Sequence, residues 1–202
     1  MTFLISSVLV FLSLLAVHQA AAPNCEDVIK PSVLEDSVIG KWLLIEGISN
    51  NPKLTNILKM MNSSWMEFSP GLSKDTLILH RGGMLHGDCQ ISSMNITFKN
   101  STFYSSVNNV TIVIDLLHSC SDCMTLSFRR QMENTTMRSL FLLTKRPKAS
   151  ESEMDLYWKQ AECLGFKREP QFSYDGVTGH CHIDEKHSAE SHTKPEPEKK
   201  DE

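Results

Sequence analysis

The chain has 202 residues, of which 22% are charged and 41% hydrophobic, and its formal net charge at pH 7 is −4. A mildly acidic chain without a basic cluster is poorly suited to binding nucleic acid, so we expect no nucleic-acid partner. The length and composition fit a globular protein with one domain and a hydrophobic core.

The first 22 residues have the pattern of a secretory signal peptide. An apolar run from Phe3 to Val17 is followed by three alanines at positions 20–22. The run is too short for a membrane span, and no later stretch is long and apolar enough to cross a bilayer. We therefore expect residues 1–22 to be a cleaved signal and the protein to be secreted into an extracellular fluid such as plasma or mucus.

Cysteines and glycosylation sequons support an extracellular location. Six cysteines follow the signal, and an even number in a secreted chain indicates disulfides, although six cysteines allow fifteen pairings. Glycosylated asparagines must face solvent. The five predicted glycosylation sites are Asn62, Asn95, Asn100, Asn109 and Asn134.

Between Gly40 and Arg146, short segments rich in β-branched and aromatic residues alternate with turn residues. The predicted strands are Lys41–Ile48, Ser64–Phe68, Thr76–His80, Cys89–Phe98, Thr102–Val107, Val110–Leu117, Met124–Arg129 and Met137–Lys145. The predicted turns are Pro70-Gly71, Gly82-Gly83, Lys99-Asn100, Asn108-Asn109 and Ser121-Asp122. Eight strands in one domain indicate an all-β barrel or sandwich.

Two helices are predicted. A short one spans Pro52–Met61, in the loop after the first strand. The second spans Ser150–Leu164, where Ser150 and Glu153 form a capping box and Gly165 ends the helix. Its apolar residues fall on one stripe, which we expect to pack on the barrel wall. Residues 182–202 are too polar to form a core, so we predict a disordered charged tail after a folded domain at 23–181.

The first predicted strand opens with Gly40-Lys41-Trp42, which resembles the first motif of the lipocalins. The chain also resembles one branch of that family, which contains the alpha-1-acid glycoproteins, the fish tributyltin-binding proteins, and the saxitoxin- and tetrodotoxin-binding proteins. The resemblance covers residues 25–181. The residues that carry it are Ile39-Gly40-Lys41-Trp42, Phe68-Ser69-Pro70, Asp75-Thr76, Cys89, Tyr157, Ala161, Cys163-Leu164 and Cys181.

This resemblance implies an eight-stranded antiparallel barrel with one flanking C-terminal α-helix. It also implies two disulfides, Cys25–Cys163 and Cys89–Cys181. Cys120 and Cys123 are additional to that pattern. We interpret them as a small disulfide across a turn, with a redox or metal site near His118 and Asp122 as the alternative.

One further family motif departs from the pattern, and the key residue of another has two candidates. The second motif is degraded to Ser121-Asp122-Cys123-Met124-Thr125. The basic residue of the third motif, which packs over the tryptophan of the first, is either Lys145 or Arg146.

Alternate residues of a barrel strand face inward. If Trp42 faces inward, as the resemblance implies, so do Leu44, Glu46 and Ile48. Glu46 would then lie inside an apolar cup, where it meets a cationic ligand or a partner, or near the mouth, where it is hydrated.

The outward-facing sequons Asn95 and Asn109 give the orientation of two more strands. The residues that they predict to face inward are Gln90, Ser92, Met94, Ile96, Phe98, Val110, Ile112, Ile114 and Leu116. Arg81 is aligned, through Cys89, with a pocket carboxylate of the mammalian alpha-1-acid glycoproteins. It either neutralises Glu46 or recruits an acidic ligand.

We therefore predict a secreted, monomeric glycoprotein that carries a small hydrophobic or amphiphilic ligand, such as a toxin, a xenobiotic or a lipid. No catalytic motif is present, so we expect no enzyme, and neither a cofactor nor a metal. The predicted ligand-binding residues are Trp42, Leu44, Glu46, Arg81, Met94, Ile96, Ile112 and Ile114. The alternatives are an immunomodulatory or acute-phase glycoprotein that acts through its surface and glycans, and a thiol or metal protein built on Cys120 and Cys123.

Overall fold

The computed structural model describes residues 24–32, 38–99, 101–107, 110–132 and 135–182. The predicted signal peptide lies outside the described residues, and so does the predicted tail apart from residue 182. Three of the five predicted glycosylation sites, Asn100, Asn109 and Asn134, also lie outside them.

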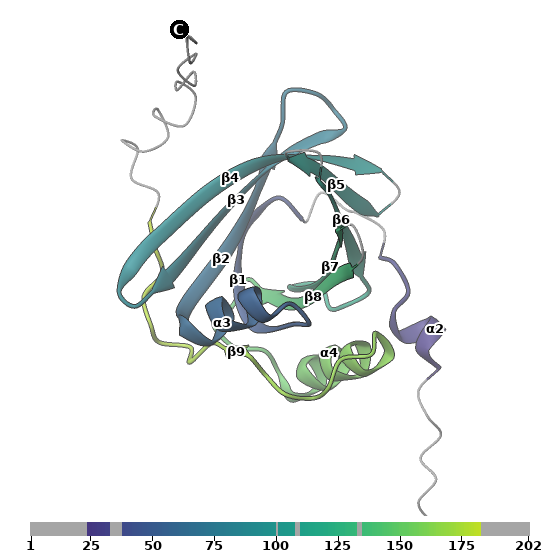
Figure 1. Ribbon diagram of the computed structural model, residues 1–202, viewed down its shortest axis with the longest axis vertical. Coiled ribbons are helices and arrows are strands. Elements are labelled where there is room, and N and C mark those ends of the chain that lie inside the picture. The colour runs from purple at the N-terminus through teal and green to yellow at the C-terminus, as the bar shows by residue number, and fades with distance from the viewer. Residues whose placement is uncertain (1–23, 33–37, 100, 108–109, 133–134, 183–202) are drawn as a thin grey trace, which may run out of the picture.

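Eight antiparallel strands form a closed barrel, as predicted (Figure 1). Each strand pairs with the next along the chain, and β1 pairs with both β2 and β8, which closes the ring. The strands are β1 (Gly40–Ser49), β2 (Met61–Pro70), β3 (Thr76–Leu85), β4 (Asp88–Lys99), β5 (Thr102–Val107), β6 (Val110–Leu117), β7 (Cys123–Met132) and β8 (Thr135–Thr144). A ninth strand, β9 (Phe172–Ser173), pairs with β1 alone. Closure leaves no long unpaired strand edge in the barrel.

Within the described residues, three helices accompany the barrel: α2 (Cys25–Val28), α3 (Pro52–Met60) and α4 (Glu151–Cys163). The predicted capping box is present in α4, because Ser150 accepts from the backbone of Glu153 and Glu153 accepts from the backbone of Ser150. Gly165, at φ 82°, follows the last turn. Across the described part of the chain, we find no helix with the length and apolarity that spanning a bilayer requires.

The prediction of a turn at Gly82-Gly83 is wrong. Both glycines lie within β3, where Gly82 pairs with Trp65. A Cβ atom on Gly82 would lie 2.6 Å from the indole ring of Trp65, so this glycine makes room for a cross-strand tryptophan. The turn that joins β3 to β4 is instead formed by His86 and Gly87, which have φ of 51° and 90°. Positive φ at both central residues is the mark of a type I′ hairpin turn.

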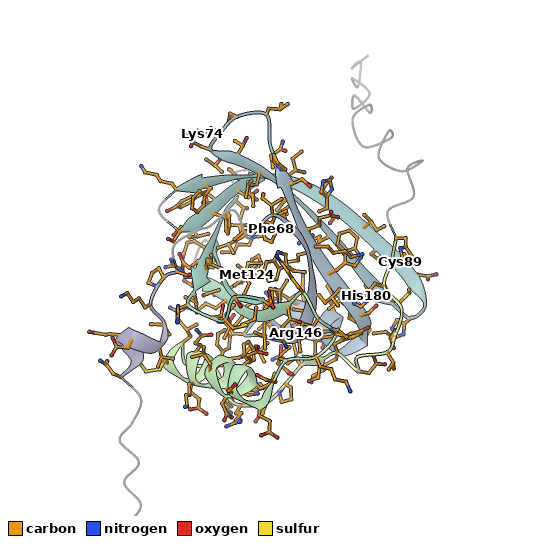
Figure 2. The ribbon with its side chains drawn as sticks, turned by 180° about the vertical axis from the view of Figure 1, so that it is seen from behind. Phe68, Lys74, Cys89, Met124, Arg146 and His180 are labelled. Atoms are coloured by element: carbon orange, nitrogen blue, oxygen red, sulfur yellow. A yellow bond between two sulfur atoms is a disulfide. The ribbon has the colours of Figure 1, made fainter. Side chains whose placement is uncertain are left out.

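The buried apolar residues form two clusters on opposite faces of the barrel wall. The inner cluster fills much of the barrel and contains Trp42, Phe68, Phe103 and Met124. Figure 2 shows Phe68 and Met124 inside the ring of strands. The outer cluster lies between the wall and α4, and includes Ile48, Leu140, Tyr157 and Trp158. The predicted stripe of α4 therefore packs on the barrel wall.

Residues 171–181, here called the C-terminal strap, cross the outside of the barrel after α4. The hydroxyl of Ser63 donates to the carbonyl of Gly179 at 2.6 Å, and the indole N–H of Trp65 donates to the carbonyl of Cys181 at 2.9 Å. Trp65 is thereby buried on the outer face, with 1% of its surface exposed. The strap covers the outer surface of β2 and β3.

Candidate functional site: the barrel lumen

The lumen is the space enclosed by the inward-facing side chains of the eight strands. Its inner cluster contains Trp42, Leu44, Ile96 and Ile114, and Met94 and Ile112 pack against that cluster from partly buried positions. These six side chains thus lie on the inner face, the face expected from the resemblance and from the outward-facing sequons. Asn62 and Asn95, the two predicted glycosylation sites in the described residues, are exposed.

The structure corrects the expected position of Glu46. The register between β1 and β8 shifts between Leu44 and Glu46, which marks a β-bulge. Residues that pair directly across antiparallel strands point to the same face of the sheet. Glu46 pairs with Leu142 and Ile48 pairs with Leu140, and both leucines belong to the outer cluster. Glu46 and Ile48 therefore face outward, toward α4, and Glu46 cannot neutralise Arg81 inside the lumen.

The carboxylate of Glu46 is sealed in the wall. It is 4% exposed, and the hydroxyl of Ser173 lies 2.8 and 3.0 Å from its two oxygens. Burial raises the pKa of Glu46 to about 7, and the hydrogen bond from Ser173 offsets only part of that effect. The charge of Glu46 also contributes to raising the pKa of Tyr157, which is raised chiefly by burial.

Arg81 lies on the inner face of β3. It pairs across the sheet with Met66, which belongs to the inner cluster, and its Nε donates to the hydroxyl of Ser92 at 2.8 Å. Its side chain is exposed, yet desolvation lowers its pKa. Both observations fit a guanidinium group in a concave surface, where water reaches the group but the surrounding protein displaces part of its hydration shell. Gln90 and Ser92 on the neighbouring strand are also exposed, so solvent reaches this part of the lumen.

Sequence reasoning missed Arg130 as a residue of the lumen. Arg130 lies on β7, where it pairs with Ile112 of β6 on one side and with Met137 of β8 on the other. Leu126 and Phe128, the alternate residues before it on the same strand, also face inward. The Nε of Arg130 is buried and has no hydrogen-bond partner among the described residues. The predicted strand ended at Arg129, three residues before the end of β7, so the alternation that would have identified Arg130 was not extended to it.

Helix α3 closes part of the end of the barrel at which β1 leaves, here called the mouth. Leu58 is buried in the inner cluster and Leu54 packs against it. The packing is close, because a Cβ on Gly47 would lie 3.2 Å from Phe141 and 3.5 Å from Leu58. The strap anchors this helix, since Gln171 exchanges hydrogen bonds with the backbone of Ser49 and accepts one from Thr55. The mouth is therefore narrowed by a helix held in place from outside.

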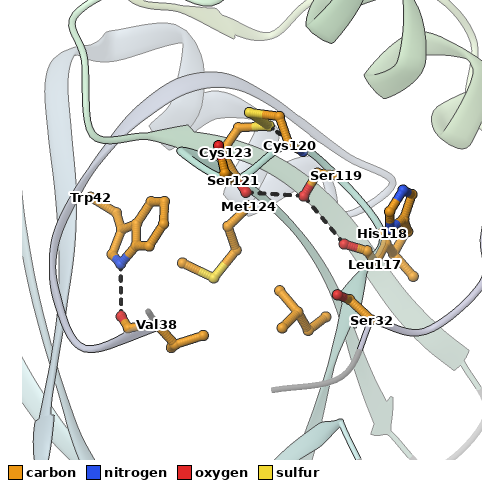
Figure 3. Close-up of a pocket in the computed structure, with 11 residues that line it drawn as sticks. Ser32, Val38, Trp42, Leu117, His118, Ser119, Cys120, Ser121, Cys123 and Met124 are labelled. Carbon is orange, nitrogen blue, oxygen red and sulfur yellow. Dashed lines mark hydrogen bonds between the residues drawn. A yellow bond between two sulfur atoms is a disulfide. The ribbon is translucent and has the colours of Figure 1, made fainter. Parts of the chain in front are cut away.

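At the opposite end of the barrel, here called the base, the indole N–H of Trp42 donates to the carbonyl of Val38 at 2.8 Å. The ammonium of Lys145 lies 4.7 Å from the centre of the Trp42 ring, so Lys145, and not Arg146, is the basic residue that packs over this tryptophan. A cavity of about 350 Å³ lies beside it, and Figure 3 shows Trp42 and Met124 on one side and Ser32 and His118 on the other. The neighbouring segment 33–37 lies outside the described residues.

Cys120 and Cys123 also line this cavity, and the structure joins them in a disulfide. Their sulfur atoms and a carboxylate oxygen of Glu153 lie within 4.8 Å of one another, a grouping that could hold a metal ion. Both sulfurs are used in the disulfide, however, and Glu153 forms an ion pair with Arg146 as well as the capping box of α4. The other two disulfides join Cys25 to Cys163 and Cys89 to Cys181, the pairs that the resemblance implies.

Comparison with known proteins finds relatives similar in sequence, although no protein-family model matches the chain. Saxitoxin and tetrodotoxin-binding protein 1 of Takifugu pardalis is 29% identical over 193 residues, and protein 2 of the same fish is 26% identical over 187 residues. Each match covers 82% of this chain but only 46% of the relative, so the chain spans about half the length of these two proteins. Alpha-1-acid glycoprotein of Oryctolagus cuniculus is 21% identical, and the match covers 92% of this chain and 94% of the relative.

Solved structures with the same fold include lipocalin 12 from rat epididymis and the siderocalin Ex-FABP. Lipocalin 12 matches with a TM-score of 0.62 at 14% identity, and the match covers 74% of this chain and 89% of lipocalin 12. Ex-FABP matches with a TM-score of 0.57 at 17% identity, and the match covers 65% of this chain and 89% of Ex-FABP. The closed barrel and its flanking helix thus have the fold of these solved lipocalins.

Proposed function

We propose that this protein is a secreted carrier that holds one small hydrophobic or amphiphilic molecule in the lumen of its barrel. The observation that carries the proposal is the composition of the inner face. Toward the base it is apolar and buried, and next to β3 and β4 it is polar and open to solvent at Arg81, Gln90 and Ser92. Binding sites for small molecules combine an apolar lining with a few placed polar groups in this way.

Three further observations support it. Two relatives are named for binding saxitoxin and tetrodotoxin, and a solved siderocalin of the same fold is described as having dual ligand specificities. The three disulfides suit an oxidising extracellular environment. The exposed sequons Asn62 and Asn95 are open to glycosylation, which belongs to the secretory pathway.

A pair of neighbouring substitutions on β4 tests where the ligand binds. Ser92 faces the lumen and Ser93 faces the outside, because Ser92 pairs with Arg81 and Ser93 with His80, and both serines are exposed. In Ser92→Trp an indole occupies the open part of the lumen, whereas in Ser93→Trp it lies in solvent. The secreted, glycosylated protein is titrated with a neutral naphthylamine dye whose fluorescence rises in apolar surroundings.

We expect saturable binding of about one dye per chain in the wild type and in Ser93→Trp, and a loss of about tenfold or more in affinity in Ser92→Trp, since overpacking a site costs on the order of 1–3 kcal/mol. Equal dye binding by the two variants would place the dye outside the lumen. Absence of saturable binding by the folded wild-type protein would contradict the carrier function and favour action through the glycans and outer surface.

A further inference from the structure

We propose that the lumen selects an anionic amphiphile, and that Arg81 and Arg130 receive the acidic head group of the ligand from opposite walls of the barrel. This inference rests on the proposed carrier function and adds the charge class of the ligand. It follows from where the register places the charged residues.

The two arginines face the same space. Arg81 lies on β3 and Arg130 on β7, which are four strands apart in a ring of eight and therefore on opposite sides of the barrel. Arg81 pairs with Met66 and Arg130 with Ile112, and both of these partners pack in or on the inner cluster. Both guanidinium groups thus project from the inner face into the enclosed space between the walls.

The structure supplies little negative charge to offset them. Among the described residues whose register places them on the inner face, the carboxylate is that of Asp88, beside the β3–β4 turn. Glu46, which would have been the natural counterion, faces outward because of the β-bulge. Helix α3, at the mouth, adds Lys53 and Lys59 and contains no acidic residue. A chain with a net charge of −4 therefore has a cationic lumen.

Within the part of the lumen that the structure describes, one buried donor lacks a partner. The Nε of Arg130 is buried without a hydrogen bond, and a buried charged donor left unpaired carries a large desolvation cost. A carboxylate or sulfate oxygen would satisfy it, since guanidinium groups bind planar oxyanions through paired N–H donors. Arg81, already held at its Nε by Ser92, would present its terminal nitrogens to the same head group. The apolar body of the ligand would then lie against the inner cluster toward the base.

The test compares three probes of equal chain length: dodecanoate, dodecan-1-ol and dodecylammonium. Each displaces the neutral dye from the wild-type glycoprotein, and isothermal titration calorimetry measures each directly. We expect dodecanoate to bind about tenfold or more tightly than the alcohol, because a hydrogen bond to a charged group is worth roughly 1.5–3 kcal/mol. Dodecylammonium should bind more weakly than the alcohol.

Variants assign the preference to the two arginines. Arg81→Met and Arg130→Met should each reduce the advantage of dodecanoate, and the double variant should abolish it while keeping affinity for the alcohol. Arg130→Lys keeps the charge and should retain part of the preference. Arg138→Met is the matched control, because Arg138 is exposed on the outer face of β8, and it should keep the full preference.

The outcomes separate the two proposals. Saturable binding of the dye with equal affinity for the three probes, or with dodecylammonium preferred, would overturn the anionic-ligand inference and leave the carrier function standing. Loss of the preference in Arg138→Met as well would also overturn it. If neither the dye nor any probe binds to the folded protein, the carrier function itself is wrong and the inference falls with it.

Discussion

The two faces of the barrel wall differ in how far they expose their charged side chains to solvent. On the outer face, Glu46 is sealed beneath the strap and α4, at 4% exposure and with Ser173 as its hydrogen-bond donor. On the inner face, Arg81 keeps its contact with solvent. The outer face thus places a carboxylate where its charge is costly, whereas the inner face keeps a charged group accessible. The outer face packs α4 onto the barrel, and we interpret the inner face as built for binding.

Removing a large side chain from the outer cluster should have the largest effect on stability. Tyr157 is fully buried between α4 and the wall, and its hydroxyl donates to the carbonyl of Leu140 at 3.0 Å. We expect Tyr157→Ala to lower the free energy of unfolding by about 3–5 kcal/mol. Met94→Ala, at a partly buried site of the lumen, should cost clearly less. Urea denaturation measures both, and equal losses would contradict the distinction between the two faces.

The pH dependence of stability should come largely from Glu46. Its pKa is about 7 in the folded protein and near 4.5 in the unfolded chain, so the folded state holds a proton more tightly. Stability from this group is fully present below pH 4.5, falls as the pH rises, and is lost above pH 7. The total loss should be on the order of 3 kcal/mol, since the two pKa values differ by about 2.5 and one unit of pKa is worth about 1.4 kcal/mol.

Glu46→Gln, which cannot ionise, should flatten this slope and be more stable than the wild type at pH 8. Denaturation curves at pH 5, 6, 7 and 8 would measure it. Glu162→Gln, at an exposed position on α4, provides the control and should keep the wild-type slope. A wild-type slope in Glu46→Gln would show that another group is responsible.

A smaller effect is expected where the strap meets the wall. Gly82→Ala would push a methyl group to 2.6 Å from the Trp65 indole, and such overpacking costs about 1–3 kcal/mol. Gly179→Ala, in the strap itself, meets no atom within 4 Å and should change stability by less than about 0.5 kcal/mol. A neutral Gly82→Ala in thermal unfolding would mean that Trp65 can shift without loss.

Much of the fold was predictable because it depends on local patterns. Thr102–Val107 and Val110–Leu117 were predicted with the bounds that the structure has, since turn residues flank both. The capping box at Ser150 identified the start of α4. The turn prediction at Gly82-Gly83 was wrong because a glycine pair is typical of a turn. Here Gly82 instead accommodates Trp65 from the neighbouring strand, and no local sequence pattern reveals that contact.

The lumen was predictable only where the alternation of the strands is regular. Met94, Ile96, Ile112 and Ile114 lie where the sequons on neighbouring positions placed them. Glu46 does not, because a bulge adds one residue to β1 and reverses the orientation of the residues that follow it, and the segment Lys41–Ile48 carries no sequence signal of that insertion.

That bulge sets the charge of the lumen without any change of residue type. In a strand of the same sequence without it, residue 46 would follow the alternation of Trp42 and Leu44 into the lumen, on the face that carries Arg81. The extra residue at Ile45 instead leaves Glu46 paired with Leu142, so that its carboxylate lies outside. The face on which a charged side chain of this wall lies therefore depends on its cross-strand partner, and an alignment that merely compares residue types in matched columns would overlook it.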